Sequence, residues 1–181
     1  MAMSLLGETV DIHVGGVDNM FPHHENEIAQ SEAATGKTFV KHWMHSEHLL
    51  VDNKKMSKSL GNFYTLRDLL KMGYSGSEAR LALIGTHYRT QLNFSISLMD
   101  ASRSSLERIQ AFIQRLHEIT EDGQTSLDLP GRLEDHLKEF TRALADDLNI
   151  SVALAALYAL VREGNTLMDQ QHLSKPDAQL I

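Results

Sequence analysis

The pattern of apolar residues changes near residue 95 of this 181-residue chain, and this change limits the folds open to it. Before residue 95, short segments of different character follow one another. After it, apolar side chains recur at spacings of three and four over long segments, which is typical of amphipathic helices. Two structural units are therefore expected, and only the first has the variety of an α/β fold.

The first unit begins with a strand, a glycine turn and a helix. Residues 9–14 alternate in polarity and are rich in β-branched side chains, so they predict a strand that ends at Gly15-Gly16. Pro22 suits the first turn of a helix, and helix formers continue over 23–34 and stop before Gly36.

Shorter elements are expected between this helix and residue 95. Residues 39–43 and 48–51 favour extended segments, a lysine-rich loop follows over 53–61, and helices are predicted at 66–72 and 77–87.

Three longer helices are expected in the second unit. The first begins near Ser97, the second contains 133–144, and the third covers 151–168. Asp122-Gly123 and Leu129-Pro130-Gly131 predict the connection between the first two. The expected fold class is mainly α with a small α/β part.

Charge and composition exclude several functions. Seventeen basic against 24 acidic side chains give a net charge of −7, which argues against a wide, non-specific nucleic-acid surface but leaves a local basic site open. The sequence shows no membrane span and no secretory signal, so we expect a cytoplasmic protein with no membrane partner. Because the chain has no cysteine, a metal site within it must use histidine and carboxylate ligands.

Histidine and glutamate side chains provide one candidate metal site. Six of the ten histidines lie within the first 50 residues, and His23 and Glu27 are spaced to lie on one helix face. Both are good zinc ligands, but two ligands do not complete a tetrahedral site. On spacing alone, an ion pair on a solvated helix explains them better than a metal does.

Two further patterns could bind a nucleotide. Gly16 and Asp18 follow the first strand, where a glycine admits a ligand to the backbone and a carboxylate can bind a ribose; an ordinary turn is the simpler explanation. Lys55 and Lys58 lie in a loop with small hydroxyl residues, suited to closing over phosphates. A solvated lysine loop explains this second pattern equally well.

Several motifs in order resemble those of cysteinyl-tRNA synthetases, a family of class I aminoacyl-tRNA synthetases. They are Gly-Gly-x-Asp at 15–18, Phe-Pro-His-His-Glu-Asn-Glu at 21–27, Trp-Met-His at 43–45, Lys-Met-Ser-Lys-Ser-Leu-Gly-Asn at 55–62, His-Tyr-Arg at 87–89, Leu-Asn-Phe-Ser at 92–95 and Ala-Asp-Asp-Leu-Asn at 145–149. The resemblance covers nearly the whole chain.

This resemblance implies a zinc-dependent selection of cysteine. In the family, the residues matching His23 and Glu27 bind zinc together with two cysteines, and the zinc binds the substrate thiolate. Soft sulfur binds zinc far better than an alcohol does, so cysteine can be told from serine without editing.

It also implies ATP-dependent charging of tRNA(Cys). Gly16 and Asp18 would lie at the ATP ribose, and Lys55 and Lys58 would act on the phosphates, with Mg²⁺ accompanying ATP. Cysteine would attack the α-phosphate, and the tRNA ribose would then take the acyl group. Catalysis would come from orientation and from cations at the developing pyrophosphate charge.

The implied architecture is the remnant of a class I Rossmann-like catalytic domain (1–50), the lysine-loop and stem-contact region (51–95), and an incomplete helical bundle on the anticodon side (96–181). The family's HIGH motif and zinc-binding cysteines have no counterpart in this sequence. We therefore expect a fragment of a larger ligase, inactive alone, whose residues 1–50 self-associate or lose order.

Two alternative functions stay open. One is the related ligase that joins cysteine to an amino sugar in mycothiol synthesis; the other is a tRNA-binding module without chemistry. Residues 46–48 and 53–54 depart from the family pattern, which puts the adenine-side contacts in doubt. His24, Trp43 and His45 fit a site or a packing role equally.

Overall fold

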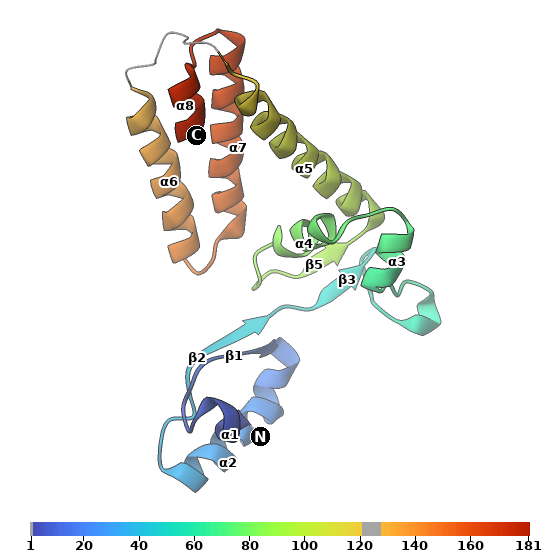
Figure 1. Cartoon of the computed structure of the whole chain (residues 1–181). Helices are drawn as coiled ribbons and strands as arrows, with labels where there is room; N and C mark the ends of the chain where they lie inside the picture. Colours follow the sequence, from blue (N-terminus) through green and yellow to red (C-terminus); the bar gives the residue numbers. More distant parts are fainter. Residues whose placement is uncertain (1, 121–127) are drawn as a thin grey trace. The chain divides into compact units, whose positions relative to one another are not determined.

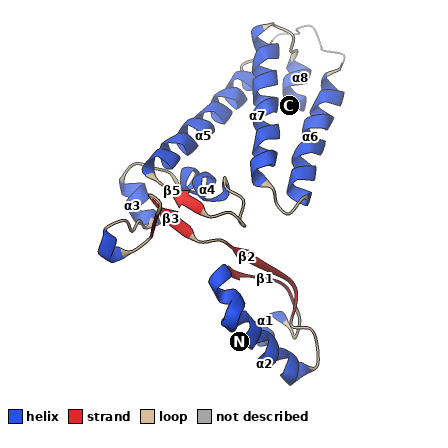
Figure 2. Cartoon of the chain, turned by 180° about the vertical axis from the view of Figure 1, so that it is seen from behind, coloured by secondary structure: helices blue, strands red, loops and turns tan. Residues whose placement is uncertain are grey.

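The computed structural model describes residues 2–120 and 128–181 and divides into two compact units (Figure 1). Unit 1 extends to Phe63 and also includes Tyr88–Phe94, whereas unit 2 consists of Tyr64–His87 and Ser95–Ile181. The chain therefore passes from one unit to the other at three points. Figure 2 shows that strands occur in unit 1 and that long helices make up most of unit 2. The predicted fold, mainly α with a small α/β part, is confirmed.

Unit 1 opens with a parallel β-α-β arrangement. Strands β1 and β2 pair in parallel from Val10 opposite Val40 to Gly16 opposite Ser46, and helix α2 connects them. This helix ends at Gly36, whose φ of +68° is a left-handed conformation that favours glycine. The bounds are α1 Ala2–Leu6, β1 Val10–Gly16, α2 Glu25–Thr35 and β2 Val40–Ser46.

The segment before α2 differs from the prediction. Pro22 does not begin a regular helix: it follows a cis peptide bond in an irregular turn, Met20–His24, where Phe21 is extended. The α-helix itself starts at Glu25. The fixed φ of proline is compatible with both arrangements, so the sequence does not distinguish them.

A second, three-stranded sheet completes unit 1. Strand β3 (Leu49–Val51) pairs antiparallel with β4 (Lys54–Lys55) and parallel with β5 (Leu92–Phe94). Asp52 and Asn53 connect β3 to β4 with φ values of +50° and +60°. Positive φ at both positions is what a two-residue hairpin turn requires, and asparagine and aspartate tolerate it.

Side chains cap the first residues of most helices of unit 2. Thr65, Ser75 and Ser174 each accept a hydrogen bond from the backbone N–H three residues on, and the carboxylate there accepts one from the backbone N–H of the cap residue. These reciprocal caps fix where the short helices begin. The helices are α3 Leu66–Lys71, α4 Gly76–Ile84, α5 Ile96–His117, α6 Leu129–Ala145, α7 Ile150–Asp169 and α8 Lys175–Leu180.

The core of unit 2 lies among α5 to α8. Phe112, Leu116, Leu129, Val161, Leu167 and Leu173 form its buried cluster. Gly164 lets α7 approach α5, because a Cβ there would lie 2.6 Å from the Phe112 ring.

The connection predicted at Leu129-Pro130-Gly131 is wrong in part, because these residues form the first turn of α6. Proline is accommodated in a first helical turn, where no backbone N–H is needed. The other predicted part of that connection, Asp122-Gly123, lies outside the described residues. Within the described ranges, no helix is long and apolar enough to span a membrane.

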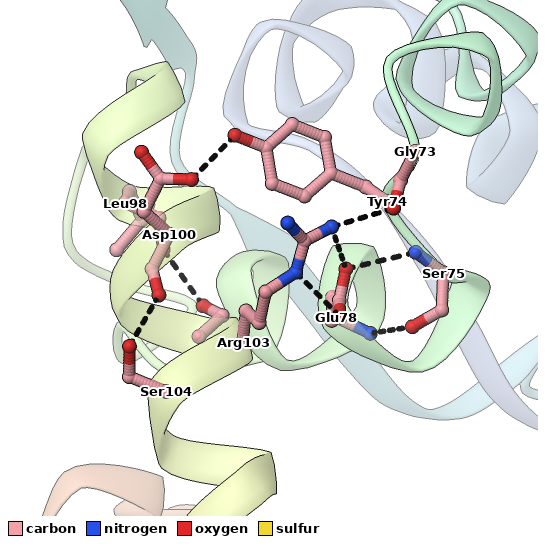
Figure 3. A network of polar contacts seen from close by, with 9 residues as sticks. Gly73, Tyr74, Ser75, Glu78, Leu98, Asp100, Arg103 and Ser104 are labelled. Atoms are coloured by element: carbon pink, nitrogen blue, oxygen red, sulfur yellow. Dashed lines mark hydrogen bonds and ion pairs between the residues drawn. The ribbon is translucent and has the colours of Figure 1, made fainter.

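A polar network joins the α3–α4 turn to α5 (Figure 3). The Arg103 guanidinium donates to both carboxylate oxygens of Glu78, at 3.1 and 3.3 Å, and to the Gly73 carbonyl at 2.5 Å. It also lies 4.5 Å from the centroid of the Tyr74 ring, and the Tyr74 hydroxyl donates to Asp100 at 2.6 Å. The network holds the first half of α5 against the α3–α4 turn.

Candidate functional site

Metal-ligating side chains gather where β1 approaches its carboxyl end. His13 extends from β1, while His24 and Glu27 come from the turn and helix that follow. One ligand atom from each of the three lies within 4.8 Å of the others. We call His13, His24 and Glu27 the histidine–glutamate cluster. Imidazole nitrogens and a carboxylate oxygen are donors that suit zinc.

The Glu27 carboxylate is the central group of this cluster. Its Oε2 lies 3.2 Å from His13 Nε2, and its Oε1 lies 3.7 Å from His23 Nε2. Oε2 is nonetheless buried and has no hydrogen-bond partner among the described residues. A buried carboxylate oxygen without a donor is costly, so this atom suits a cation bound beside it.

Glu163 shows why the neighbours of Glu27 matter. Its Oε1 is also buried without a hydrogen bond, but it forms an ion pair with Arg132, which is always charged. The neighbours of Glu27 are imidazoles, which can be neutral and act as metal ligands themselves. The two carboxylates therefore differ in what balances their charge.

His24 is the most buried member of the cluster, with 3% of its surface exposed. Burial is the main cause that lowers the pKa of His24, and the neighbouring His13 and His45 lower it further. His24 Nδ1 and His45 Nε2 lie 2.8 Å apart, so one ring donates and the other accepts. A neutral imidazole, as favoured here, has a nitrogen lone pair available to a metal.

Aromatic packing holds these rings in place. The Trp43 ring centroid lies 4.8 Å from that of His13 and 4.8 Å from that of His24. Gly15 leaves space for His24, because a Cβ on Gly15 would lie 2.6 Å from His24 Cε1. The absence of a side chain on Gly15 therefore makes room for a buried histidine ring.

The predicted pair, His23 and Glu27, lies at the edge of this cluster. Their side chains come within 3.7 Å, but His23 is 65% exposed and is not one of the three residues with mutually close ligand atoms. Sequence reasoning missed His13. Its place two residues before Gly15-Gly16, at the end of a predicted strand, was the available signal.

Gly16 is the last residue of β1, and Asp18 follows it closely in the turn after the strand. A Cβ on Gly16 would lie 2.4 Å from Asp18 Oδ1, so the carboxylate occupies the space that glycine leaves beside the backbone. Asp18 is exposed and available to a ligand.

The lysine loop, residues 55–59, is an exposed turn beyond the β3–β4 hairpin. Lys55 ends β4, and Lys58 begins a 3-10 turn that closes at Gly61, whose φ is +67°. Both lysine side chains belong to exposed residues, and the Lys58 ammonium lies 5.4 Å from the centroid of the Phe63 ring. Among the described residues, no carboxylate forms an ion pair with either ammonium group, so the loop presents two cations without counter-charges there.

Comparison with known proteins identifies the family of this chain. The model of the class I (C) tRNA synthetase catalytic domain matches residues 1–104, and that of the DALR domain matches residues 139–181. Cysteine–tRNA ligases of Protochlamydia amoebophila and Chlamydia pneumoniae are 59% and 54% identical over the whole chain. The chain spans 38% of the length of each.

Solved structures show the same fold. Methionyl-tRNA synthetase of Mycobacterium tuberculosis bound by methionyl-adenylate matches 89% of this chain and 34% of its own, with a TM-score of 0.67 and 19% identity. A leucyl-tRNA synthetase of Agrobacterium radiobacter in a ternary complex matches 93% of this chain and 23% of its own, with a TM-score of 0.66 and 18% identity. The family predicted from the motifs is confirmed: this chain belongs to the class I (C) tRNA synthetase family, together with the cysteine–tRNA ligases.

Proposed function

We propose that this chain provides the amino-acid-selecting and phosphate-binding parts of a cysteine–tRNA ligase. The observation that carries the proposal is the buried Oε2 of Glu27, which lies beside His13 and His24 and accepts no hydrogen bond from the described residues. A cation-binding site at the end of a parallel strand is where an α/β fold binds its ligands. The name cysteine–tRNA ligase, which the 50–59% identical relatives bear, supports cysteine and tRNA as substrates, and the family resemblance implies ATP and tRNA(Cys).

Glu27 would hold zinc together with the imidazoles around it. His13 and His24 are the partners that the geometry favours, and His23 is the partner that the family resemblance implies. When bound, zinc supplies a soft Lewis acid that prefers a thiolate to an alcohol. Trp43 and the buried His24 would exclude water from the bound thiolate and keep the imidazoles oriented.

Lys55 and Lys58 would act on the phosphates of ATP, and Gly16 and Asp18 would bind its ribose. As the cysteine carboxylate attacks the α-phosphate, charge builds up on the departing pyrophosphate, which the two ammonium groups would stabilise. Mg²⁺ would accompany ATP. The lysines are exposed in this structure, as a loop that closes on its substrate requires.

The two alternatives are less well supported. Relatives that are 50–59% identical bear the name of the tRNA ligase rather than of a sugar ligase, and the DALR match lies outside the catalytic-domain match. A tRNA-binding module without chemistry gives no reason for a buried carboxylate among histidines. We accordingly place the protein in cytoplasmic protein synthesis.

A cobalt experiment tests the selection of cysteine. The chain contains no cysteine, so a sulfur-to-cobalt charge-transfer band in its Co²⁺ complex must come from an added thiol. We expect L-cysteine to produce a protein-dependent band and L-serine to produce none. The spectrum of Glu27→Gln, measured at the same concentrations, is the control for the band of cobalt–cysteine that forms without the protein site, and it is subtracted from the spectrum of the unaltered chain. Equal spectra for the two chains would contradict the proposal.

Two histidine variants identify the ligands. His13→Ala and His23→Ala are compared for zinc affinity by competition with a chromophoric chelator. Loss of affinity in His13→Ala alone would assign the site to the histidine–glutamate cluster, whereas loss in His23→Ala would support the pair implied by the family. Unchanged affinity in both would refute a zinc site at Glu27.

A further inference from the structure

Asn62 lies shortly after the lysine loop, and its side chain contacts the first part of that loop and the strand before it. Its Oδ1 accepts a hydrogen bond from Ser57 N at 2.9 Å. Its Nδ2 donates to the Lys55 carbonyl at 3.1 Å and approaches the Val51 carbonyl at 3.4 Å. One amide group therefore joins a β3 carbonyl, the end of β4 and the first part of the loop.

The backbone between these contacts is a closed turn. Leu60 N donates to Ser57 O at 3.3 Å and Gly61 N donates to Lys58 O at 3.2 Å. The left-handed conformation of Gly61 then turns the chain back so that Asn62 reaches Ser57. Lys58 lies inside this turn, between Ser57 and Asn62, which a hydrogen bond joins.

The next residue holds the side chain of the same lysine. Phe63 places its ring 5.4 Å from the Lys58 ammonium, an attraction that leaves the charge unneutralised. Asn62 thus holds the backbone of the loop in position, and the Phe63 ring contacts the Lys58 ammonium group.

We propose that Asn62 is a positioning residue of the lysine loop, which fixes the backbone of Lys55 and Ser57 so that both ammonium groups meet a phosphate substrate together. The inference rests on the proposed function, since it assigns Asn62 a role in phosphate binding by Lys55 and Lys58. Asn62 itself need not touch the substrate. An amide suits this role because it donates and accepts without adding charge near the phosphates.

Asn93 offers a matched control at the other end of the hairpin. Its Oδ1 accepts from Asn53 N at 2.7 Å and so supports the Asp52-Asn53 turn, but within the described part of the chain no hydrogen bond connects its side chain to the lysine loop. Asn93→Ala and Asn62→Ala each remove one asparagine from the same small sheet. Only the second removes the connection to Ser57.

The experiment measures inorganic pyrophosphate binding to the full chain by calorimetry, together with hydrogen exchange of the Ser57 amide. We expect Asn62→Ala to speed that exchange and to weaken pyrophosphate binding by about tenfold, the ratio that a change of 1.4 kcal/mol produces. Asn93→Ala should leave the affinity within about twofold. Lys58→Ala gives the effect of removing the charge itself.

The outcomes separate the two proposals. Wild-type pyrophosphate affinity in Asn62→Ala, with Lys58→Ala weakened, would refute the role of Asn62 and retain that of the lysines. Failure of the unaltered chain to bind pyrophosphate would overturn both. If Asn62→Ala does not fold, Asn62→Asp keeps the acceptor for Ser57 N and should keep its slow exchange; fast exchange there would overturn the proposed contact.

Discussion

Two polar clusters of this molecule, one in each unit, have charged groups that are balanced very differently. In the Arg103 network of unit 2, Glu78 accepts from a guanidinium and from the Ser75 backbone, so its carboxylate is fully hydrogen-bonded. In the histidine–glutamate cluster of unit 1, Glu27 keeps one buried oxygen without a donor. The first arrangement stabilises a fold. We propose that the second leaves a coordination position for a metal ion, at a cost to stability.

The largest expected effect is on zinc binding. Glu27→Gln should weaken zinc by at least about 100-fold, more than the loss typical of residues that only support a ligand. In the metal-free chain, the same change should alter the melting temperature by no more than about 2 °C, because Glu27 gains little from its neighbours there. Chelator competition and thermal melting measure the two quantities. Glu78→Gln should show the reverse behaviour, losing stability and keeping zinc.

The second prediction tests whether packing maintains the cluster. Gly15→Ala places a methyl group 2.6 Å from His24 Cε1, so the buried ring must move. Overpacking of this kind costs about 1–3 kcal/mol. Urea unfolding followed by the fluorescence of Trp43, which is the single tryptophan and belongs to unit 1, measures it.

Gly36→Ala is the control for that variant. Its surroundings are open but its φ is +68°, so alanine should cost stability through backbone strain alone. Zinc affinity should fall in Gly15→Ala and stay unchanged in Gly36→Ala. An equal fall in both would mean that general destabilisation, and not the position of His24, controls the metal.

The smallest effect concerns the pH dependence of unit 2. The Arg103 guanidinium, together with the Ser75 backbone N–H, lowers the pKa of Glu78 below its usual value of about 4.5. Because the folded pKa is depressed, this carboxylate contributes stability above about pH 4.5 and loses it as the pH falls through the lower folded value.

Comparison of Glu78→Gln with the unaltered chain measures this contribution. At pH 7 the variant should melt about 2–4 °C lower, and the difference should shrink as the pH falls below about 4.5. A difference that stays constant down to pH 3 would show that shape, rather than charge, accounts for the effect.

The sequence was most informative where structure is local. The strand before Gly15, the helix that stops at Gly36 and the amphipathic helices of unit 2 all follow from patterns within a few residues. Pairing between distant segments was not predictable. Nothing near Leu92 indicates that β5 lies parallel to β3, because side-chain alternation does not identify a partner strand.

The residues of the candidate site show the same difference between local patterns and long-range contacts. Glu27, Lys55 and Lys58 were found through motifs, whereas His13 and Asn62 became evident only from contacts across the fold. The i, i+4 rule gave His23 as the neighbour of Glu27 and could not show that β1 brings a second imidazole to the same carboxylate. Long-range geometry adds ligands that spacing cannot.

The three passages of the chain between the units also have a consequence for how the protein is made. Strand β3 obtains its parallel neighbour only when β5 has been synthesised, and α3 and α4 emerge from the ribosome in between. During translation, the edge of β3 and the β3–β4 hairpin stay without their parallel neighbour while α3 and α4 are synthesised and fold. During this interval an unpaired strand edge is exposed and can pair with another chain. We therefore expect chaperone binding to matter most at this stage of synthesis.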